Sequence, residues 1–210
     1  MKNMFSYDSP AITALNKVAD IILVNLLFLV TCIPVVTIGA AQSALFTVAF
    51  RWAKREEAGA KEYCSAFRRN FRGSLLPWLI MLAAGVALAY NLFFTVRNQL
   101  PFRGLMIAVF ILLSVVYFII LSQLFPFFAK FNCTVRQLFS NALLTALAHP
   151  LRTIVVIALE VFPWALLLAA TETFIQLTPL WLLVYASLRG YITALMVRAP
   201  YSRYEEQLGI

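Results

Sequence analysis

The sequence is poor in the charged residues that soluble proteins place on their surfaces. Only 12% of its 210 residues are charged, whereas 62% are hydrophobic, and the mean hydropathy is +0.85. An average soluble domain is about 25% charged and about 45–50% apolar. Because a soluble chain of this length must cover its surface with polar side chains, the composition excludes a soluble globular domain and indicates a membrane protein.

Residues that hold metals or carry out catalysis are also scarce. The three cysteines, Cys32, Cys64 and Cys133, are odd in number and far apart, so they predict neither a disulfide framework nor a metal site. The single histidine, His149, has no cysteine or acidic residue at ligand spacing, and we interpret it as an interfacial residue. The chain has no nucleotide-binding glycine loop, no H-E-x-x-H and no G-x-S-x-G motif. We therefore expect no catalytic residues, no cofactor and no metal.

Acidic residues are outnumbered, with nine Asp and Glu against 17 Lys and Arg, and the formal net charge is +8. A protein that binds nucleic acid carries its basic residues on a soluble face, but here they lie in the gaps between apolar runs. This arrangement is typical of the cytoplasmic loops of membrane proteins and of attraction to anionic lipid headgroups. We expect membrane lipid, and no nucleic acid, as a partner.

Apolar runs long enough to cross a bilayer follow one another along the chain. A membrane-spanning helix needs about 20 predominantly apolar residues. The pattern predicts an all-α, polytopic transmembrane bundle that forms one membrane domain over residues 1–210, with no soluble domain. We expect six spans, at residues 17–33, 39–53, 74–96, 105–129, 151–171 and 179–197.

The first two spans depend on how one long apolar run, residues 18–50, is interpreted. As a single helix this run would be about 50 Å long, too long for one ordinary span, and Pro34 and Gly39 lie in its middle. Because proline interrupts a helix and glycine permits a chain reversal, we predict a helical hairpin. Two alternatives stay open: one tilted span, and a signal peptide, although the run is longer than the apolar core of such peptides.

Two further segments have the periodicity of amphipathic helices. Residues 58–72 place Tyr63, Phe67 and Phe71 on one face, and residues 133–148 form the second such helix. We predict that the first lies in the membrane interface with its aromatic face toward lipid; a solvated loop helix is the alternative. The arginines that we expect near the lipid phosphates are Arg68, Arg69 and Arg72.

The basic residues also predict an orientation. With six spans and a cytoplasmic N-terminus, all but three of the 17 basic residues lie in cytoplasmic segments. The exceptions are Arg97 and Arg103 outside and Arg189 within a span. We therefore expect a multi-pass protein of the plasma membrane with its C-terminus and basic loops in the cytoplasm. A single tilted first span would leave these loops in place but move the N-terminus to the other side.

Two charged residues, Glu160 and Arg189, lie well inside predicted spans. An isolated charge at the centre of a bilayer costs about 3 kcal/mol or more. The two spans are antiparallel neighbours, and both residues are equally far along the chain from the middle of the connecting segment. We predict a buried ion pair, which either fixes the register of two helices or belongs to a substrate or proton site. Other polar residues in spans, Asn25, Gln42 and Gln123, are expected to hydrogen-bond between helices.

Several segments resemble a known family. They are residues 16–20, 25–27, 34–40 and 54–57, then Phe67, Asn70 and Phe71, and finally Phe125 and Pro126. These features are similar to the YesL-like family of bacterial membrane proteins, which is defined by a domain of unknown function. The resemblance implies a small multi-span protein often encoded beside carbohydrate-uptake ABC transporter genes, and it brings no established activity or site residues.

We therefore expect a non-catalytic integral membrane protein that is accessory to carbohydrate uptake transport or its regulation. Its expected partners are lipid and a transporter subunit or another membrane protein. The alternative is a small solute transporter or channel that uses Glu160 and Arg189; an ABC permease subunit is less expected, because the chain is short and lacks a clear coupling-loop signature. A continuous polar cavity that reaches both charges would favour transport, and a dry, tightly packed bundle would favour the accessory role.

Overall fold

A computed structural model of the protein describes residues 10–98, 101–131 and 133–208, and nearly all of them are helical. The elements are α1 (Pro10–Cys32), η1 (Val35–Thr37), α2 (Ile38–Ala53), α3 (Ala60–Arg97), α4 (Arg103–Lys130), α5 (Val135–Ala148), α6 (Pro150–Ala169), α7 (Thr171–Gln176), α8 (Thr178–Leu180), η2 (Trp181–Tyr185) and α9 (Ala186–Leu208). No strand occurs within these ranges. Six segments of the described residues are long and apolar enough to cross a membrane. The all-α, polytopic fold is therefore confirmed.

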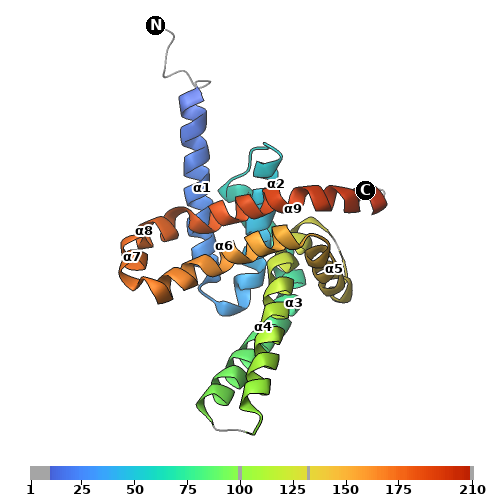
Figure 1. Cartoon of the computed structure of the whole chain (residues 1–210). Helices are drawn as coiled ribbons and strands as arrows, with labels where there is room; N and C mark the ends of the chain where they lie inside the picture. The colour runs from blue at the N-terminus through green and yellow to red at the C-terminus, as the bar shows by residue number, and fades with distance from the viewer. Residues whose placement is uncertain (1–9, 99–100, 132, 209–210) are drawn as a thin grey trace.

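The helices form a body from which two segments project (Figure 1). α3 and α4 pair with each other and continue beyond the body as an antiparallel hairpin, and the N-terminal part of α1 projects on the opposite side. α6 and α9 lie side by side and run across α1 and the hairpin. Apolar side chains such as Phe93 and Leu112 are exposed on the hairpin. In a bilayer these side chains face lipid or another protein, and the helices satisfy their own backbone groups.

The long N-terminal apolar run is divided into two helices, as its proline and glycine predict. Between α1 and α2, the Thr37 hydroxyl donates a hydrogen bond to the Pro34 carbonyl oxygen at 2.7 Å. The Trp78 indole N–H of α3 donates to the Val35 carbonyl oxygen, also at 2.7 Å. The first bond lies within the turn between the two helices, and the second attaches this turn to α3. The run is therefore a hairpin and does not form a single tilted span.

α2 is the central helix, and half of its candidate span is buried. It contacts α3, α4 and α9. A Cβ atom on Gly39 would lie 2.6 Å from Trp78 Cβ and 3.0 Å from the Ser74 carbonyl oxygen. Because neither atom can rotate away from its backbone, only glycine permits this approach of α2 to α3.

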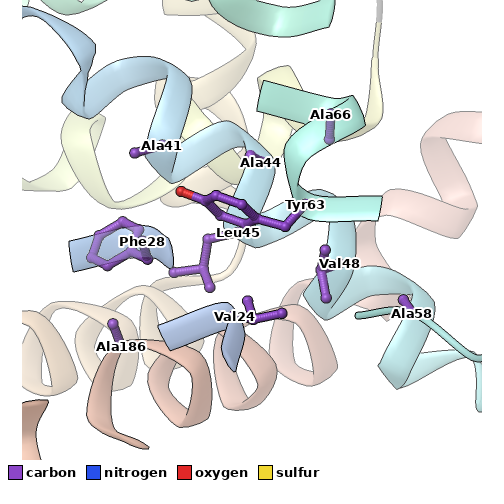
Figure 2. Packing of buried hydrophobic residues seen from close by; sticks show 10 residues of the cluster. All are labelled: Val24, Phe28, Ala41, Ala44, Leu45, Val48, Ala58, Tyr63, Ala66 and Ala186. Carbon is purple, nitrogen blue, oxygen red and sulfur yellow. The ribbon is translucent and has the colours of Figure 1, made fainter. Parts of the chain in front are cut away.

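The prediction of a separate interfacial helix at residues 58–72 is wrong. α3 runs without a break through Pro77 and contains both this segment and the span expected at residues 74–96. Tyr63 is fully buried, and its hydroxyl lies 2.6 Å from the Thr31 hydroxyl of α1. Figure 2 shows Tyr63 among buried side chains of α1 and α2 rather than turned toward lipid. The periodicity identified an apolar face, but it does not distinguish a face that meets lipid from one that meets protein.

The second amphipathic segment does form a helix of its own, α5. The Thr134 N–H donates to Gln137 Oε1 at 3.1 Å, which is one half of a capping box at the helix start. Leu138 and Ala142 are buried in a cluster with α4 side chains. The last span is less regular than expected, since α8, η2 and the first part of α9 together form it.

Candidate functional site

The two charges predicted to pair lie together in the interior of the body. Arg189 Nη1 on α9 is 3.0 Å from Glu160 Oε1 on α6, and the two side chains are 9% and 17% exposed. Arg189 Nη2 also donates to Gln42 Oε1 on α2 at 2.8 Å. The guanidinium group therefore connects three helices. Because arginine stays protonated in proteins, the neighbouring carboxylate balances a charge that hydrocarbon would otherwise penalise.

The register of α6 and α9 follows from the short connection between them and from a second contact. The Tyr185 hydroxyl donates a hydrogen bond to the Leu159 carbonyl oxygen, next to Glu160. The helices are antiparallel neighbours, so residues equally distant from the connection meet at the same depth. The two contacts together fix which residues of α6 face α9.

Asn25 of α1 holds the irregular segment that precedes α9. η2 is a π-helical turn over Trp181–Tyr185. Asn25 is fully buried; its Nδ2 donates to the Leu182 carbonyl oxygen at 2.7 Å, and its Oδ1 accepts from the Ser187 N–H at 2.9 Å. These two backbone groups are five residues apart, the pair that a π-helix would join directly. The Asn25 amide therefore bridges them and sets the rotation of α9 two residues before Arg189.

We expect Asn25→Leu to lower the free energy of unfolding by about 1–3 kcal/mol, because it removes both hydrogen bonds that the Asn25 amide forms with the Leu182 C=O and the Ser187 N–H. Asn91→Leu is the matched control, since Asn91 is exposed on α3 and bonds the backbone of its own helix at Ala87. Thermal or denaturant unfolding of both variants in one detergent measures the difference. Equal losses in the two variants would count against the bridge.

A cavity of about 470 Å³ lies beside the ion pair. Its polar lining consists of Gln42, Glu160 and Arg189. The apolar lining residues are Ile38, Phe46, Trp78, Phe118, Leu121, Phe125, Val161 and Trp164. A concave site with mostly apolar and aromatic walls and a few polar groups is the usual form of a small-molecule site, and such sites measure about 300–1,000 Å³.

The charges in this cavity balance, because one carboxylate faces one guanidinium group. Within the described ranges, Glu160 Oε2 and the Gln42 amide nitrogen have no protein hydrogen-bond partner. One carboxylate oxygen that accepts and one amide NH2 group that donates are therefore available to a bound molecule. The arrangement suits a neutral, hydrogen-bonding solute better than an ion, which would leave an uncompensated charge in a region of low dielectric constant.

The other residues considered from the sequence lie away from this cavity. Arg68, Arg69 and Arg72 are exposed on the N-terminal part of α3. The cysteines are free thiols, and burial raises the pKa of Cys133, between α4 and α5, which favours the protonated thiol. Among the described residues, no group of three His, Cys, Asp or Glu side chains could hold a metal ion.

Comparison with known proteins links the chain to one family. The family model described as "Protein of unknown function, DUF624" matches residues 21–92. The Bacillus subtilis (strain 168) "Uncharacterized protein YesL" is 25% identical over 120 residues, which are 56% of this chain and 56% of that protein. The chain is therefore similar to the DUF624 family over residues 21–92, and to YesL over about half of its length. The aligned part of this YesL-like chain spans about half the length of its curated relative, and no solved structure matches the chain significantly.

The family match covers one side of the candidate site. Residues 21–92 of this YesL-like chain include Asn25, Gly39 and Gln42, but not Glu160 or Arg189. The matched region therefore contains the α1–α2 turn, the close contact with α3 and the amide that binds the guanidinium group. The ion pair itself comes from the C-terminal helices outside the family match.

Sequence reasoning found the ion pair but missed the aromatic wall of the cavity. A usable signal was present, because Trp164 is four residues after Glu160 and Phe46 is four residues after Gln42. Residues four apart share one face of a helix, so each polar residue predicts the aromatic one beside it. No comparable signal places Trp78, which reaches the cavity from α3 through tertiary packing.

Proposed function

We propose that this YesL-like protein is a non-catalytic membrane protein that binds a small neutral solute of the carbohydrate class as an accessory to carbohydrate uptake. The observation that carries the proposal is the cavity itself, in which the atoms of Gln42, Glu160 and Arg189 meet aromatic walls. The carbohydrate class agrees with what the family resemblance implies.

The chemistry of the lining supports this solute class. Carboxylate and amide oxygens accept hydrogen bonds from sugar hydroxyl groups, and guanidinium and amide N–H groups donate to them. The rings of Trp78 and Trp164 offer flat apolar surfaces for the C–H faces of a sugar ring. A hydroxyl group that enters hydrocarbon without a partner is penalised by a few kcal/mol. The three polar side chains of the lining offset this penalty.

The residues that line the cavity favour an accessory role over transport. Eight of its 11 lining residues are apolar, and such a lining suits a pocket for one molecule better than a continuous polar path across the membrane. The apolar faces of the projecting α3–α4 hairpin (Figure 1) offer a large surface to lipid or to a transporter subunit. We place the C-terminus and the basic loops on the cytoplasmic side of the plasma membrane, because basic loops are retained there.

A small transporter that uses Glu160 and Arg189 is the second candidate, and it is favoured by the contact of both charges with the cavity. Uptake of labelled sugar into proteoliposomes that contain this chain alone distinguishes the two functions. We expect sugar binding without uptake in such vesicles. Uptake that is lost in Glu160→Gln would instead assign transport to the chain.

Binding is tested by thermal unfolding of the purified protein in neutral detergent with a panel of neutral mono- and disaccharides. A ligand at 100 times its Kd stabilises the folded state by about 2.7 kcal/mol. We expect Gln42→Leu to weaken binding about fivefold, since one lost hydrogen bond contributes about 1 kcal/mol. Asn91→Leu, far from the cavity on the exposed face of α3, should bind as the unmodified protein does. A panel in which no sugar raises the transition, or a Gln42→Leu variant with unchanged affinity, would exclude this function.

A further inference from the structure

A second pocket lies at the ends of three helices, apart from the ion pair. Its volume is about 220 Å³. The residues that line it are Thr47, Phe50, Lys54, Ala129, Lys130 and Arg198. Three of these six residues are basic and none is acidic. The pocket shares no residue with the cavity beside Glu160 and Arg189.

The basic residues of this pocket lie where three candidate spans end. The apolar segments of α2, α4 and α9 end at Ala53, Lys130 and Arg198, and Lys54 directly follows Ala53. The three helices contact one another. The end of an apolar span marks the boundary between hydrocarbon and headgroups. The ends of these three candidate spans therefore predict a pocket at the depth of the phospholipid phosphates.

Two of the cations are available to an anion. Arg198 Nη1 donates to the Ala53 carbonyl oxygen at 3.0 Å, which holds the guanidinium group against the end of α2 and leaves its other N–H donors free. Lys54 is exposed beside it. In the part of the chain that the structure describes, neither residue forms an ion pair. Lys130 Nζ lies 5.6 Å from the centre of the Tyr201 ring, so this cation is held by packing at the same pocket.

We propose that this pocket binds a phosphate group, supplied by the headgroup of an anionic phospholipid of the adjacent leaflet. Lys54 and Arg198 donate charge-assisted hydrogen bonds to the phosphate oxygens, and Phe50 contacts the apolar part of the lipid. Attraction of a cation to a helix C-terminus explains the bond from Arg198 to Ala53, but not the convergence of three cations on one pocket. Basic pockets between spans at this depth suit anionic headgroups. A lipid bound there joins α2, α4 and α9.

The test uses three probes on the full chain in neutral detergent: phosphatidylglycerol, phosphatidylcholine with the same acyl chains, and inorganic phosphate. Native mass spectrometry and thermal unfolding measure binding. We expect retention of phosphatidylglycerol and a raised transition, with neither effect from phosphatidylcholine. The double substitution Lys54→Gln and Arg198→Gln should weaken phosphatidylglycerol binding at least tenfold. The matched control, Arg97→Gln and Arg103→Gln, removes the same charge from the far end of the α3–α4 hairpin (Figure 1) and should leave binding unchanged.

Three results would overturn the proposal. If phosphatidylglycerol binding weakens equally in the control variant, the loss reflects general attraction between opposite charges and not a specific site. Stabilisation by inorganic phosphate equal to that by phosphatidylglycerol would assign the pocket to a free anion instead of a lipid. If the double variant does not fold, Lys54→Gln alone decides the question, because Lys54 is exposed; unchanged phosphatidylglycerol binding in that variant would exclude the site.

Discussion

Replacing Arg189 by methionine is expected to lower the free energy of unfolding by about 3–5 kcal/mol, because breaking a buried ion pair from one side leaves an uncompensated charge. The Glu160 carboxylate would keep its position in the interior with its cationic partner gone. The Gln42 amide would lose its hydrogen bond as well. Reversible unfolding in detergent micelles, by heat or denaturant, measures this loss.

The control is the double substitution Glu160→Met and Arg189→Met, which replaces the pair by apolar side chains of similar length. Such replacements are often neutral or stabilising in other proteins. We therefore expect the double variant to be more stable than Arg189→Met alone, with a favourable coupling energy in the double-mutant cycle. Losses that simply add would show that the two side chains do not interact. A stable double variant would also test the binding function, since it should fold but no longer bind sugar.

Gly39→Ala is expected to lower the free energy of unfolding by about 1–3 kcal/mol, the usual penalty for an overpacked contact. Within a helix, alanine is otherwise favoured over glycine by about 1 kcal/mol, so the expected sign opposes intrinsic propensity. The added Cβ would lie 2.6 Å from Trp78 Cβ. α2 must then move away from α3, and the hydrogen bond from Trp78 to the Val35 carbonyl group is strained.

Gly104→Ala supplies the matched comparison for Gly39→Ala. Gly104 lies in the first turn of α4, and a Cβ atom there would meet nothing within 4 Å. The same substitution should therefore leave stability unchanged or raise it by up to about 1 kcal/mol. Opposite signs at the two positions support the close contact between α2 and α3, whereas a gain at both would refute it.

The sequence was sufficient for those features that a bilayer imposes on any chain. Hydrocarbon requires long apolar helices, so the six spans are visible as apolar runs. Pro34 and Gly39 act locally, and the division of the first run follows from backbone geometry alone. The contact of Glu160 with Arg189 follows from counting along a helical hairpin, because the two helices are joined by a short connection.

Features that depend on how distant helices pack could not be predicted in this way. Tyr63 belongs to an apolar stripe that suits lipid and protein equally, so its burial against Thr31 depends on where α1 lies. The continuity of α3 through Pro77 is a tertiary result, because Trp78 and the adjoining turn are packed against α2. The hydrogen bond between Asn25 and Ser187 joins residues 162 positions apart, and no local sequence pattern predicts this partner.

Whether the cavity beside the ion pair receives a polar solute is decided by the access of water to its wall. The three native cysteines are first replaced. Val161→Cys then places a thiol in the wall of the cavity, and Leu112→Cys places one on the exposed apolar face of α4. We expect a charged, membrane-impermeant thiol reagent to modify the Val161→Cys variant in intact membranes but not the Leu112→Cys variant. A sugar that binds in the cavity should slow the modification of Val161→Cys. If the reagent modifies neither variant, the cavity is closed to water. Glu160 and Arg189 would then serve only to hold α6 and α9 together.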